Sequence, residues 1–585
     1  MLTFKARKPK KTPSILLLAV SLMCLLNACS EGSGNQPSLA VSTSASTAKT
    51  TVITNNSSVP NQNSSDASKS LPAAGAYGPA KTFIFGLAQE PIGFNQIGFD
   101  PAQLTDRASL LVTRQLYEGL FEYKPDSMGV LYSSFVRNVQ PSTDGRVYRV
   151  RLRKGIVFSD GTPLDAAAVK FNFDRWSNEG SIYHKGEFET WHMFWGGFPG
   201  NLESVLVADS INLTITLKTP SASFFQVLAM PQFGIVAPSA FDKNGSFQQA
   251  IGSGPYLLNQ IIREEPKRLI LKSNPNYIVE RQDKNHLPDL SQIVVQILRA
   301  NQDGLKELKD GHLSATDKVR PEQTSQTNPA YQFLLRPPLN VTFLSMNQSK
   351  APFDNLNVRR AFAYAINSAD MTSTAFLGLG EPANGLLPPT ALGYRTEQST
   401  YPYDPAQARQ LLVQAGYPNG LVVDLWRLPE PRPYYPDTQR VADAVVQDLA
   451  RVGVTVHIQN SDWATFYQNR DDGNLAFFMN GWQGVNGDPD EFLQAIFNQT
   501  QRANGYYPLV LARLIEQAHT SSAAMTATFD PARQSLYRQI FDQIYRDVPN
   551  IPLAFVKEPL AIRPNVVGYI PNPSGIDSWA NLKLK

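Results

Sequence analysis

Hydrophobic and polar residues recur with two different periods along the chain after residue 80, and these periods predict its strands and helices. Residues 82–87 form a short apolar run that is typical of a buried strand. Residues 147–153 alternate apolar and basic side chains, which predicts a half-buried strand entered from a turn at 143–145. Over residues 104–120 apolar side chains recur at helical spacing and predict a helix with one buried face: Leu110, Leu111, Val112, Leu116, Tyr117 and Leu120.

Helical and strand patterns continue to alternate later in the chain. Residues 437–452 predict a helix with Val441, Val445, Val446 and Leu449 on one face, and residues 454–458 then alternate as a strand. Residues 358–366 predict a helix whose core side is formed by Val358, Ala361, Phe362 and Ala365. This mixture indicates an α/β or α+β protein in which helices cover the sheets.

The length of this part of the chain bounds its organisation. Roughly 505 residues exceed what one hydrophobic core usually serves, so we expect two or three lobes. No tract after residue 81 approaches the length of apolar sequence that a membrane-spanning helix needs.

The first 28 residues have the pattern of a secretory signal. A basic segment without acidic residues precedes a short apolar run at 15–26, and a small residue, Ala28, stands before Cys29. Twelve helical residues span only about 18 Å, against a hydrocarbon core of about 30 Å. We therefore interpret residues 1–28 as a signal peptide that is removed.

Cys29 is a candidate for lipid attachment. Leu26-Asn-Ala-Cys resembles the bacterial lipobox, in which the cysteine is acylated and becomes the new N-terminus, although Asn27 departs from the usual small or apolar residue. An ordinary secretory signal with an incidental cysteine is the alternative. Cleavage and acylation would use both cysteines of the chain, Cys24 and Cys29, and leave no free thiol, which suits an oxidising compartment.

Residues 29–80 are interpreted as the lipidated cysteine and a tether. Their Ser, Thr, Asn, Gly and Ala cannot bury enough apolar surface to offset the entropy of ordering them. Removal of residues 1–28 takes five of the 53 basic residues and none of the 50 acidic ones, so the net charge changes from +3 to −2. No basic tract remains, and we expect no nucleic-acid partner.

Enzyme motifs are lacking after the signal segment. The sequence has no Gly-x-Ser-x-Gly, His-Glu-x-x-His, P-loop or Cys-x-x-Cys motif. Its six histidines show no recognisable metal-ligand spacing. We expect no catalysis, no cofactor and no metal site.

Several sequence blocks identify a family. Residues 158–166 read Phe-Ser-Asp-Gly-Thr-Pro-Leu-Asp-Ala, and further blocks follow the family's order at 116–120, 252–256, 357–366, 403–412 and 481–493. Together they closely resemble the family 5 extracellular solute-binding proteins, which serve dipeptide, oligopeptide, opine and nickel ABC importers. The blocks extend over essentially residues 82–580, and the dipeptide-binding members are the most similar over 420–493.

The resemblance implies a three-lobed α/β fold of the periplasmic binding protein type II, cluster C-like. Lobe I would comprise residues 82–121, 250–340 and 555–585, lobe II residues 122–249, and lobe III residues 341–554. Two chain crossings between the large lobes would form a hinge, and ligand would be enclosed when the lobes close.

The resemblance also implies where a peptide would bind. Arg432 stands at the position where dipeptide-binding members hold the ligand carboxylate, a role that suits a planar guanidinium. A surface or structural arginine is the alternative. Further candidates come from the Trp-x-x-Asp element and the residues after it: Trp482, Gly484, Val485, Asn486 and Asp488.

Val485 departs from the family pattern, because peptide-binding members place there the aspartate that meets the ligand ammonium. A valine neither accepts a hydrogen bond nor neutralises a charge. Either the ammonium is met elsewhere, with Asp488 and Asp490 nearby in sequence, or the ligand has no free ammonium. The second hypothesis predicts an N-blocked or otherwise non-standard ligand that bears a carboxylate.

The aromatic run at 191–198 allows two interpretations. It could line the ligand cavity or form a lid between glycines, or it could be a satellite core beneath a long loop.

The expected function is that of a solute-binding lipoprotein, a monomer that captures peptides or peptide-like carboxylate ligands for the permease and ATPase subunits of an ABC importer. It would be lipid-anchored at the periplasmic or extracellular face of the envelope. A nickel, metal-chelate or haem-type ligand is the alternative within the same fold. A surface sensor or adhesin without transport is the alternative from another class.

Overall fold

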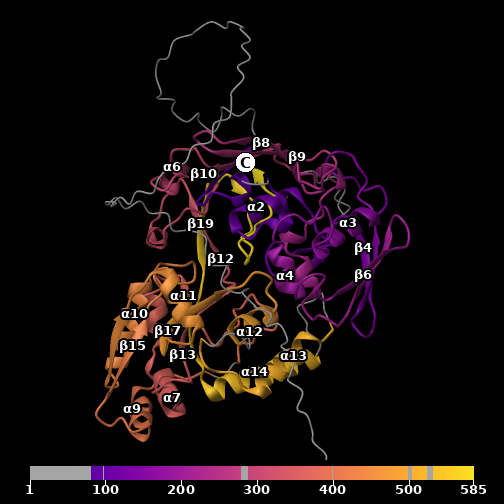
Figure 1. The fold of residues 1–585 in the computed structure, drawn as a ribbon. Coiled ribbons are helices and arrows are strands. Elements are labelled where there is room, and N and C mark those ends of the chain that lie inside the picture. Colours follow the sequence, from indigo (N-terminus) through magenta and orange to yellow (C-terminus); the bar gives the residue numbers. More distant parts are fainter. Residues whose placement is uncertain (1–80, 96–97, 278–287, 398–399, 498–502, 523–530) are drawn as a thin grey trace, which may run out of the picture.

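The computed structural model describes residues 81–95, 98–277, 288–397, 400–497, 503–522 and 531–585. The signal, Cys29 and tether predicted at 1–80 lie outside these residues. Three sheets organise the described chain: in Figure 1 the seven-stranded sheet lies at the top, the four-stranded sheet at the right and the six-stranded sheet at the lower left.

The seven-stranded sheet has the order β12-β19-β11-β1-β10-β9-β8. β1 pairs in parallel with β10 and β11, and the other neighbours are antiparallel. β1 is apolar and buried along nearly its whole length, as expected for a strand covered on both faces. The strands are β1 (Thr82–Leu87), β8 (Tyr256–Ile262), β9 (Arg268–Ser273), β10 (Gln292–Ile297), β11 (Ala315–Thr316), β12 (Gln332–Arg336) and β19 (Glu558–Ile562).

The four-stranded sheet is antiparallel, in the order β4-β5-β7-β6. β5 buries Tyr148, Val150 and Leu152 while Arg149 and Arg151 face solvent, which confirms the predicted alternating strand. Its elements are β4 (Val136–Pro141), β5 (Val147–Leu152), β6 (Leu202–Val207), β7 (Asn212–Leu217), α3 (Ala166–Ser177), α4 (Glu189–Trp195) and α5 (Phe224–Leu228).

The six-stranded sheet has the order β14-β18-β13-β17-β15-β16. A hydrophobic core packs it against α7, α8, α9 and α10. Its elements are β13 (Asn340–Met346), α7 (Leu356–Ala365), α8 (Ser368–Thr374), β14 (Gly380–Pro382), α9 (Pro405–Gln414), β15 (Leu421–Trp426), α10 (Thr438–Ala450), β16 (Val454–Gln459), α11 (Trp463–Asp471), β17 (Phe477–Gln483), α12 (Pro489–Phe497), α13 (Leu509–His519), α14 (Pro531–Asp547) and β18 (Asn550–Val556).

Shorter elements connect and cover the sheets. They are α1 (Ile92–Asn95), α2 (Arg107–Leu116), α6 (Gly304–Lys309), the hairpin β2 (Phe121–Tyr123) and β3 (Val130–Tyr132), the ribbon β20 (Val566–Val567) and β21 (Lys583–Leu584), and the 3₁₀ turns η3 (Pro101–Gln103), η4 (Pro231–Phe233), η5 (Pro238–Ala240) and η6 (Pro321–Ser325). Among the described helices, none combines the length and the apolar character that a membrane crossing requires.

The predicted helices are present, with limits that differ by a few residues from those predicted. The pattern at 104–120 yields α2, which begins after Asp106 because that side chain caps the helix. The pattern at 437–452 yields α10, capped by Asp437. The four predicted core residues of α7 are all buried. Periodicity therefore located each helix, and the capping residue set where it starts.

The chain passes between the seven-stranded and six-stranded sheets twice. β12 leads through 337–339 into β13, and β18 leads through Lys557 into β19, so the crossings lie side by side. Asn340, at the start of β13, is buried; its Nδ2 donates to the Val556 carbonyl (2.8 Å) and its Oδ1 accepts from the Val556 N–H (2.9 Å). The two connections are therefore fastened to each other.

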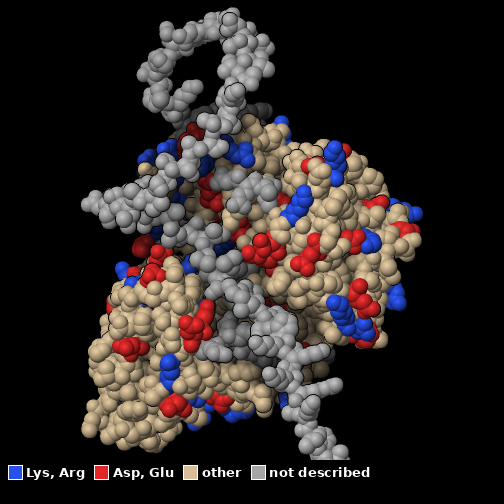
Figure 2. Space-filling view, viewed as in Figure 1, with Lys and Arg blue, Asp and Glu red and all other residues tan. Residues whose placement is uncertain are grey.

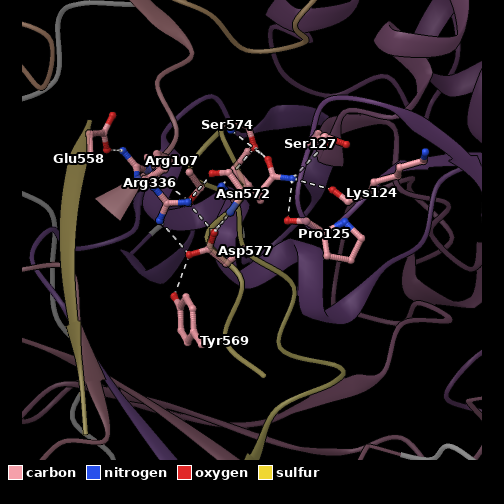
Figure 3. Close-up of polar contacts among 12 residues, drawn as sticks. Arg107, Lys124, Pro125, Ser127, Arg336, Glu558, Tyr569, Asn572, Ser574 and Asp577 are labelled. Atoms are coloured by element: carbon pink, nitrogen blue, oxygen red, sulfur yellow. Dashed lines mark hydrogen bonds and ion pairs between the residues drawn. The ribbon is translucent and has the colours of Figure 1, made fainter. Parts of the chain in front are cut away.

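A buried polar network holds the C-terminal segment at the crossings (Figure 3). Arg336, the last residue of β12, forms a two-pronged ion pair with Asp577, which also accepts from the Tyr569 hydroxyl at 2.7 Å. Asn572 donates to the Lys124 carbonyl (2.9 Å) in the turn of the β2–β3 hairpin. These contacts fix residues 569–577.

Charged side chains of both signs are interspersed over the face shown in Figure 2. This distribution agrees with the near balance of 53 basic and 50 acidic residues in the whole chain.

Candidate ligand-binding cleft

A cleft of about 310 Å³ lies where the three sheet regions meet. Its volume is at the lower end of the range of small-molecule sites, about 300–1,000 Å³. One wall is formed by the segment around α2 with η4, and another by β13, β17 and the loops beside them. Walls that come from separate sheets are what a ligand enclosed between lobes requires.

The candidates predicted from the sequence divide into two groups. Arg432, Trp482, Gly484 and Val485 line the cleft. Asn486 and Asp488 are not among its lining residues and are buried, with exposed fractions of 1% and 0%. The second group lies in the loop behind the first.

Arg432 is positioned by a tight turn and an aromatic ring. Its N–H donates to the Tyr435 carbonyl at 3.0 Å, and the Tyr435 N–H donates back at 2.8 Å. Tyr435 is fully buried, and its hydroxyl donates to the Phe343 carbonyl on β13 at 3.1 Å. The Arg432 guanidinium lies over Trp463, 4.0 Å from the ring centroid. Stacking of this kind holds the guanidinium by its face.

A second guanidinium, which the sequence reasoning missed, belongs to the same wall. Arg470 lines the cleft, lies 4.6 Å from the ring centroid of Tyr467, and donates from Nε to Asp471 Oδ1 at 2.7 Å. Tyr467 stacks in turn on Trp463, with 5.2 Å between the ring centroids. The available signal was the spacing of Trp463, Tyr467 and Arg470 along α11, which places them on neighbouring faces of one helix.

Glu491, also missed, organises the loop that carries Val485. Its carboxylate accepts from the backbone N–H groups of Val485 (2.7 Å) and Asn486 (2.9 Å) and from the indole N–H of Trp482 (3.2 Å). Burial raises the pKa of Glu491 to about 7, and its backbone and indole donors act in the opposite direction. Its place in the first turn of α12, where negative charge is favoured, was the sequence signal.

Gly484 allows the loop to approach the first crossing. Its N–H donates to the Leu339 carbonyl at 2.7 Å, and an added Cβ would lie 2.7 Å from Phe492 and 2.9 Å from Leu339. Any larger residue would push the loop away from its neighbours. Gly484 therefore shapes the wall rather than contacting ligand through a side chain.

The two aspartates closest in sequence to Val485 already have cationic partners. Asp488 pairs with Arg533 through contacts of 2.6 and 3.0 Å, and both side chains are almost fully buried. Asp490 Oδ2 lies 2.6 Å from His519 Nδ1, and this hydrogen bond is the main reason that the pKa of His519 rises to about 9. Both carboxylates serve to fasten α12 to α13 and α14.

The opposite wall carries Asp106 and Gln232. Asp106 caps α2, with Oδ1 accepting from the Ser109 N–H at 2.8 Å, while its Oδ2 is buried and has no hydrogen-bond partner. Gln232, in η4, is 3% exposed, and its Oε1 likewise has no partner. Among the lining residues that the structure describes, Asp106 is the only acidic one.

The aromatic run at 191–198 belongs to a core. Trp191 and Trp195 are buried and stacked with 4.3 Å between ring centroids, and Trp191 also meets Phe173 and Trp176. None of the run lines the cleft. Trp191 and Trp195 belong to the largest buried core of the described residues and not to a separate satellite core, so neither interpretation describes the run as the structure has it.

The described residues contain no group of three or more His, Cys, Asp and Glu side chains placed to hold a metal ion. The charged residues that line the cleft are Asp106, Arg107, Arg432 and Arg470.

Known proteins share both the sequence and the fold. The family model of the bacterial extracellular solute-binding proteins, family 5 (middle region), matches residues 130–504. Heme-binding protein A of Haemophilus influenzae is 30% identical over 541 residues, which cover 89% of this chain and 96% of that protein. The dipeptide-binding protein of Escherichia coli K12 is 30% identical over 532 residues, covering 86% and 95%. The structure of HbpA2 from Haemophilus parasuis has a TM-score of 0.77 at 26% identity and covers 86% of this chain and 100% of that one.

Proposed function

This chain belongs to the bacterial extracellular solute-binding proteins of family 5, and we propose that it captures peptides or peptide-like carboxylate ligands for an ABC importer. Its fold is that of a three-lobed periplasmic binding protein. The observation that carries the proposal is the cleft between the sheets, where two stacked guanidiniums face the space that a ligand would occupy. Proteins of this family act in the periplasm or outside the cell.

Arg432 and Arg470 suit a carboxylate-bearing ligand. A planar guanidinium makes paired, charge-assisted hydrogen bonds with a carboxylate. Trp463 and Tyr467 hold the two guanidiniums by their faces, which limits the rotamer entropy that binding has to overcome. We assign Arg432 to the ligand carboxylate, with Arg470 in support.

Capture is coupled to lobe closure about the two crossings. A ligand shifts an open–closed equilibrium only as far as it binds the closed state more tightly. One wall of the cleft comes from α2 and η4 and the other from β13, β17 and their loops, so a ligand that contacts both walls favours closure. The lobe boundaries at 121/122, 249/250, 340/341 and 554/555 remain a prediction.

We also propose that the protein acts as a lipid-anchored monomer. The support is the lipobox-like sequence ending at Cys29 and the polar tether that follows it. The permease and ATPase subunits of the importer are the expected partners.

A haem-type ligand is the second candidate. The 30% identity with heme-binding protein A favours it. Haem carries two propionate carboxylates, for which Arg432 and Arg470 offer two guanidiniums.

A thermal-shift panel tests the proposal. Purified protein, freed of bound ligand by partial unfolding, is mixed with di- to pentapeptides, their N-acetylated and C-amidated forms, haem, and nickel with and without a carboxylate chelator. A ligand present at a hundred times its Kd adds about 2.7 kcal/mol of stability. We expect shifts with peptides that carry a free C-terminal carboxylate and none with their C-amides. Stabilisation by haem alone would favour the second candidate, and equal stabilisation by acids and amides would contradict the carboxylate assignment.

A further inference from the structure

We infer that Asp106, assisted by Gln232, receives the amino group of the ligand, so that the amino and carboxylate ends of a peptide attach to opposite walls of the cleft. This inference deepens the proposed function and rests on it. It identifies the ligand as a zwitterion with a free amino group, although position 485 carries a valine.

The carboxylates around Val485 are already engaged. Asp488 is paired with Arg533, and Asp490 is paired with His519 through Oδ2, while its Oδ1 is buried without a hydrogen-bond partner. Glu491 accepts three hydrogen bonds from the loop behind the cleft. None of these three acids lines the cleft. A ligand amino group therefore has to find its anion on another wall.

Asp106 has an oxygen that lacks a donor. Its Oδ1 serves the cap of α2, and its Oδ2 is buried without a hydrogen bond. A buried polar atom with no partner is unfavourable, and more so when the group is charged. Burial raises the pKa of Asp106 in spite of the hydrogen bonds from Ser109. An ammonium that arrives with the ligand supplies both the missing donor and the missing positive charge.

The neighbouring arginine does not fill this role. Arg107 follows Asp106 in the chain and also lines the cleft. Its Nη1 pairs with Glu558 on β19, as Figure 3 shows, and its Nε donates to the Gly575 carbonyl at 3.3 Å. Arg107 is thus directed toward the second crossing, and Oδ2 of Asp106 remains without a hydrogen-bond donor.

Gln232 adds a second acceptor to the same wall. η4 packs against α2, so the two residues stand on adjoining elements. Gln232 Oε1 is buried and has no partner. An ammonium has three donors, and a carboxylate with an amide oxygen beside it can accept at least two of them.

This arrangement gives the cleft a polarity that couples binding to closure. Asp106 and Gln232 stand on the α2–η4 wall, where Arg107 is paired with Glu558. Arg432 and Arg470 stand on the wall of the six-stranded sheet, which also carries Gln483, whose Oε1 is buried without a partner. The acidic group and the two stacked guanidiniums are therefore on opposite walls. A zwitterionic ligand satisfies both only when the walls face each other across it. Loss of either end charge would remove one of the two attachments.

The test compares Asp106→Asn with a matched control. Asparagine caps helices about as well as aspartate, so the variant removes the charge and keeps α2. Asp165→Asn makes the same change at the cap of α3, where the side chain accepts from the Ala168 N–H at 2.9 Å, away from the cleft. Thermal melting of both variants checks that they fold.

Calorimetry then measures binding of trialanine and glutathione, each with a free and with an N-acetylated amino group. We expect Asp106→Asn to weaken binding of the free forms at least tenfold, equivalent to about 1.4 kcal/mol, with no change for the acetylated forms. Asp165→Asn should change neither, and Gln232→Ala should weaken the free forms by a smaller factor.

Two results would overturn the inference while leaving the proposed function intact. One is wild-type protein that binds acetylated and free peptides equally well. The other is an Asp106→Asn variant that keeps full affinity for the free forms or loses affinity for both forms alike. If folded wild-type protein bound no member of the panel, the inference and the peptide-binding proposal would both be overturned.

Discussion

At Arg432 the position of one side chain results from contacts with three separate segments. The turn with Tyr435 fixes the backbone, the Tyr435 hydroxyl ties that turn to β13, and the Trp463 ring of α11 supports the guanidinium. A lysine at this position would keep the charge but lose the planar fork and the stacking.

We therefore predict that Arg432→Lys weakens binding of a carboxylate ligand by about 1.5–3 kcal/mol, the range for hydrogen bonds to charged groups. Arg440→Lys is the control, because Arg440 lies on the exposed side of α10 with Asp437 at 3.0 Å and does not line the cleft. Calorimetry with a peptide and its C-amide checks the prediction. A loss of the same size for both ligands would show that Arg432 acts on the fold and not on the carboxylate.

The His519–Asp490 pair should make stability depend on pH in the alkaline range. Pairing raises the pKa of His519 in the folded protein from 6.5 to about 9, with Glu516 and Asp488 adding to the effect of Asp490. The folded state therefore holds this proton more tightly than the unfolded state, so the stabilisation is complete below pH 6.5 and is lost as pH rises through 9.

The measurement is the midpoint of urea unfolding from pH 6 to 10 for the wild type and His519→Gln. We expect the difference between them to be largest near pH 6 and to shrink toward pH 10. A difference that stays constant across this range would show that the pair does not titrate as described.

At the scale of the elements, α12 is held by side chains from two later helices as well as by its own loop. The loop before it is fastened by Glu491, its first turn is fastened to α14 through Asp488 and Arg533, and Asp490 ties it to the end of α13. The same helix places Ile496 on the cleft. The packing of α12 against α13 and α14 thus determines the shape of the wall that carries Val485.

Arg533→Met should destabilise the protein by about 3–5 kcal/mol, because it leaves Asp488 buried without a counter-charge. The double variant Arg533→Met with Asp488→Leu should recover most of this loss, since a pair of apolar side chains has no buried charge. Arg440→Met, which breaks an exposed pair, should cost no more than about 1 kcal/mol. Urea unfolding of the three variants checks the order, and equal losses for the two single variants would contradict it.

At the scale of the whole molecule, two adjacent connections join the seven-stranded and six-stranded sheets, whose regions also share a buried core away from the cleft. Asn340 fastens one connection to the other, and the Arg336–Asp577 network fixes the segment that carries Ser574 and Ile576 on the cleft. Relative rotation about these connections changes the width of the cleft without altering either sheet.

We predict that ligand narrows the distance between the four-stranded and six-stranded sheets. The only cysteines are Cys24 and Cys29, so spin labels can be added to protein that lacks residues 1–29. Leu206 on β6 and Val422 on β15 are 63% and 62% exposed and suit replacement by cysteine. Double electron–electron resonance measures the distance between the two spin labels. We expect this distance to be shorter, and its distribution narrower, with a bound peptide than without one.

The control places labels at Val422 and at Val413 on α9, which both belong to the region of the six-stranded sheet. Ligand should not change the distance between these two labels. An unchanged 206–422 distribution, in a sample that calorimetry shows to be saturated, would mean that binding proceeds without closure.

The sequence by itself determined the class of the fold, the family and part of the site. Helix and strand periods are local, because a buried face repeats every 3.6 or 2 residues, so α2, α7, α10 and β5 could be located within short windows. Arg432 and Val485 were predicted from the resemblance to dipeptide-binding members, and both line the cleft, while their contact with ligand stays a prediction.

Only the tertiary structure decided which charges remain available for a ligand. Asp488 and Asp490 stood close to Val485 in sequence, yet Arg533 and His519, from later helices, neutralise them. Asp106 lies more than three hundred residues before Arg432, yet both line one cleft. The physical reason is that burial and ion pairing depend on the atoms that surround a group in space, and those neighbours are brought together only when the separate sheets pack.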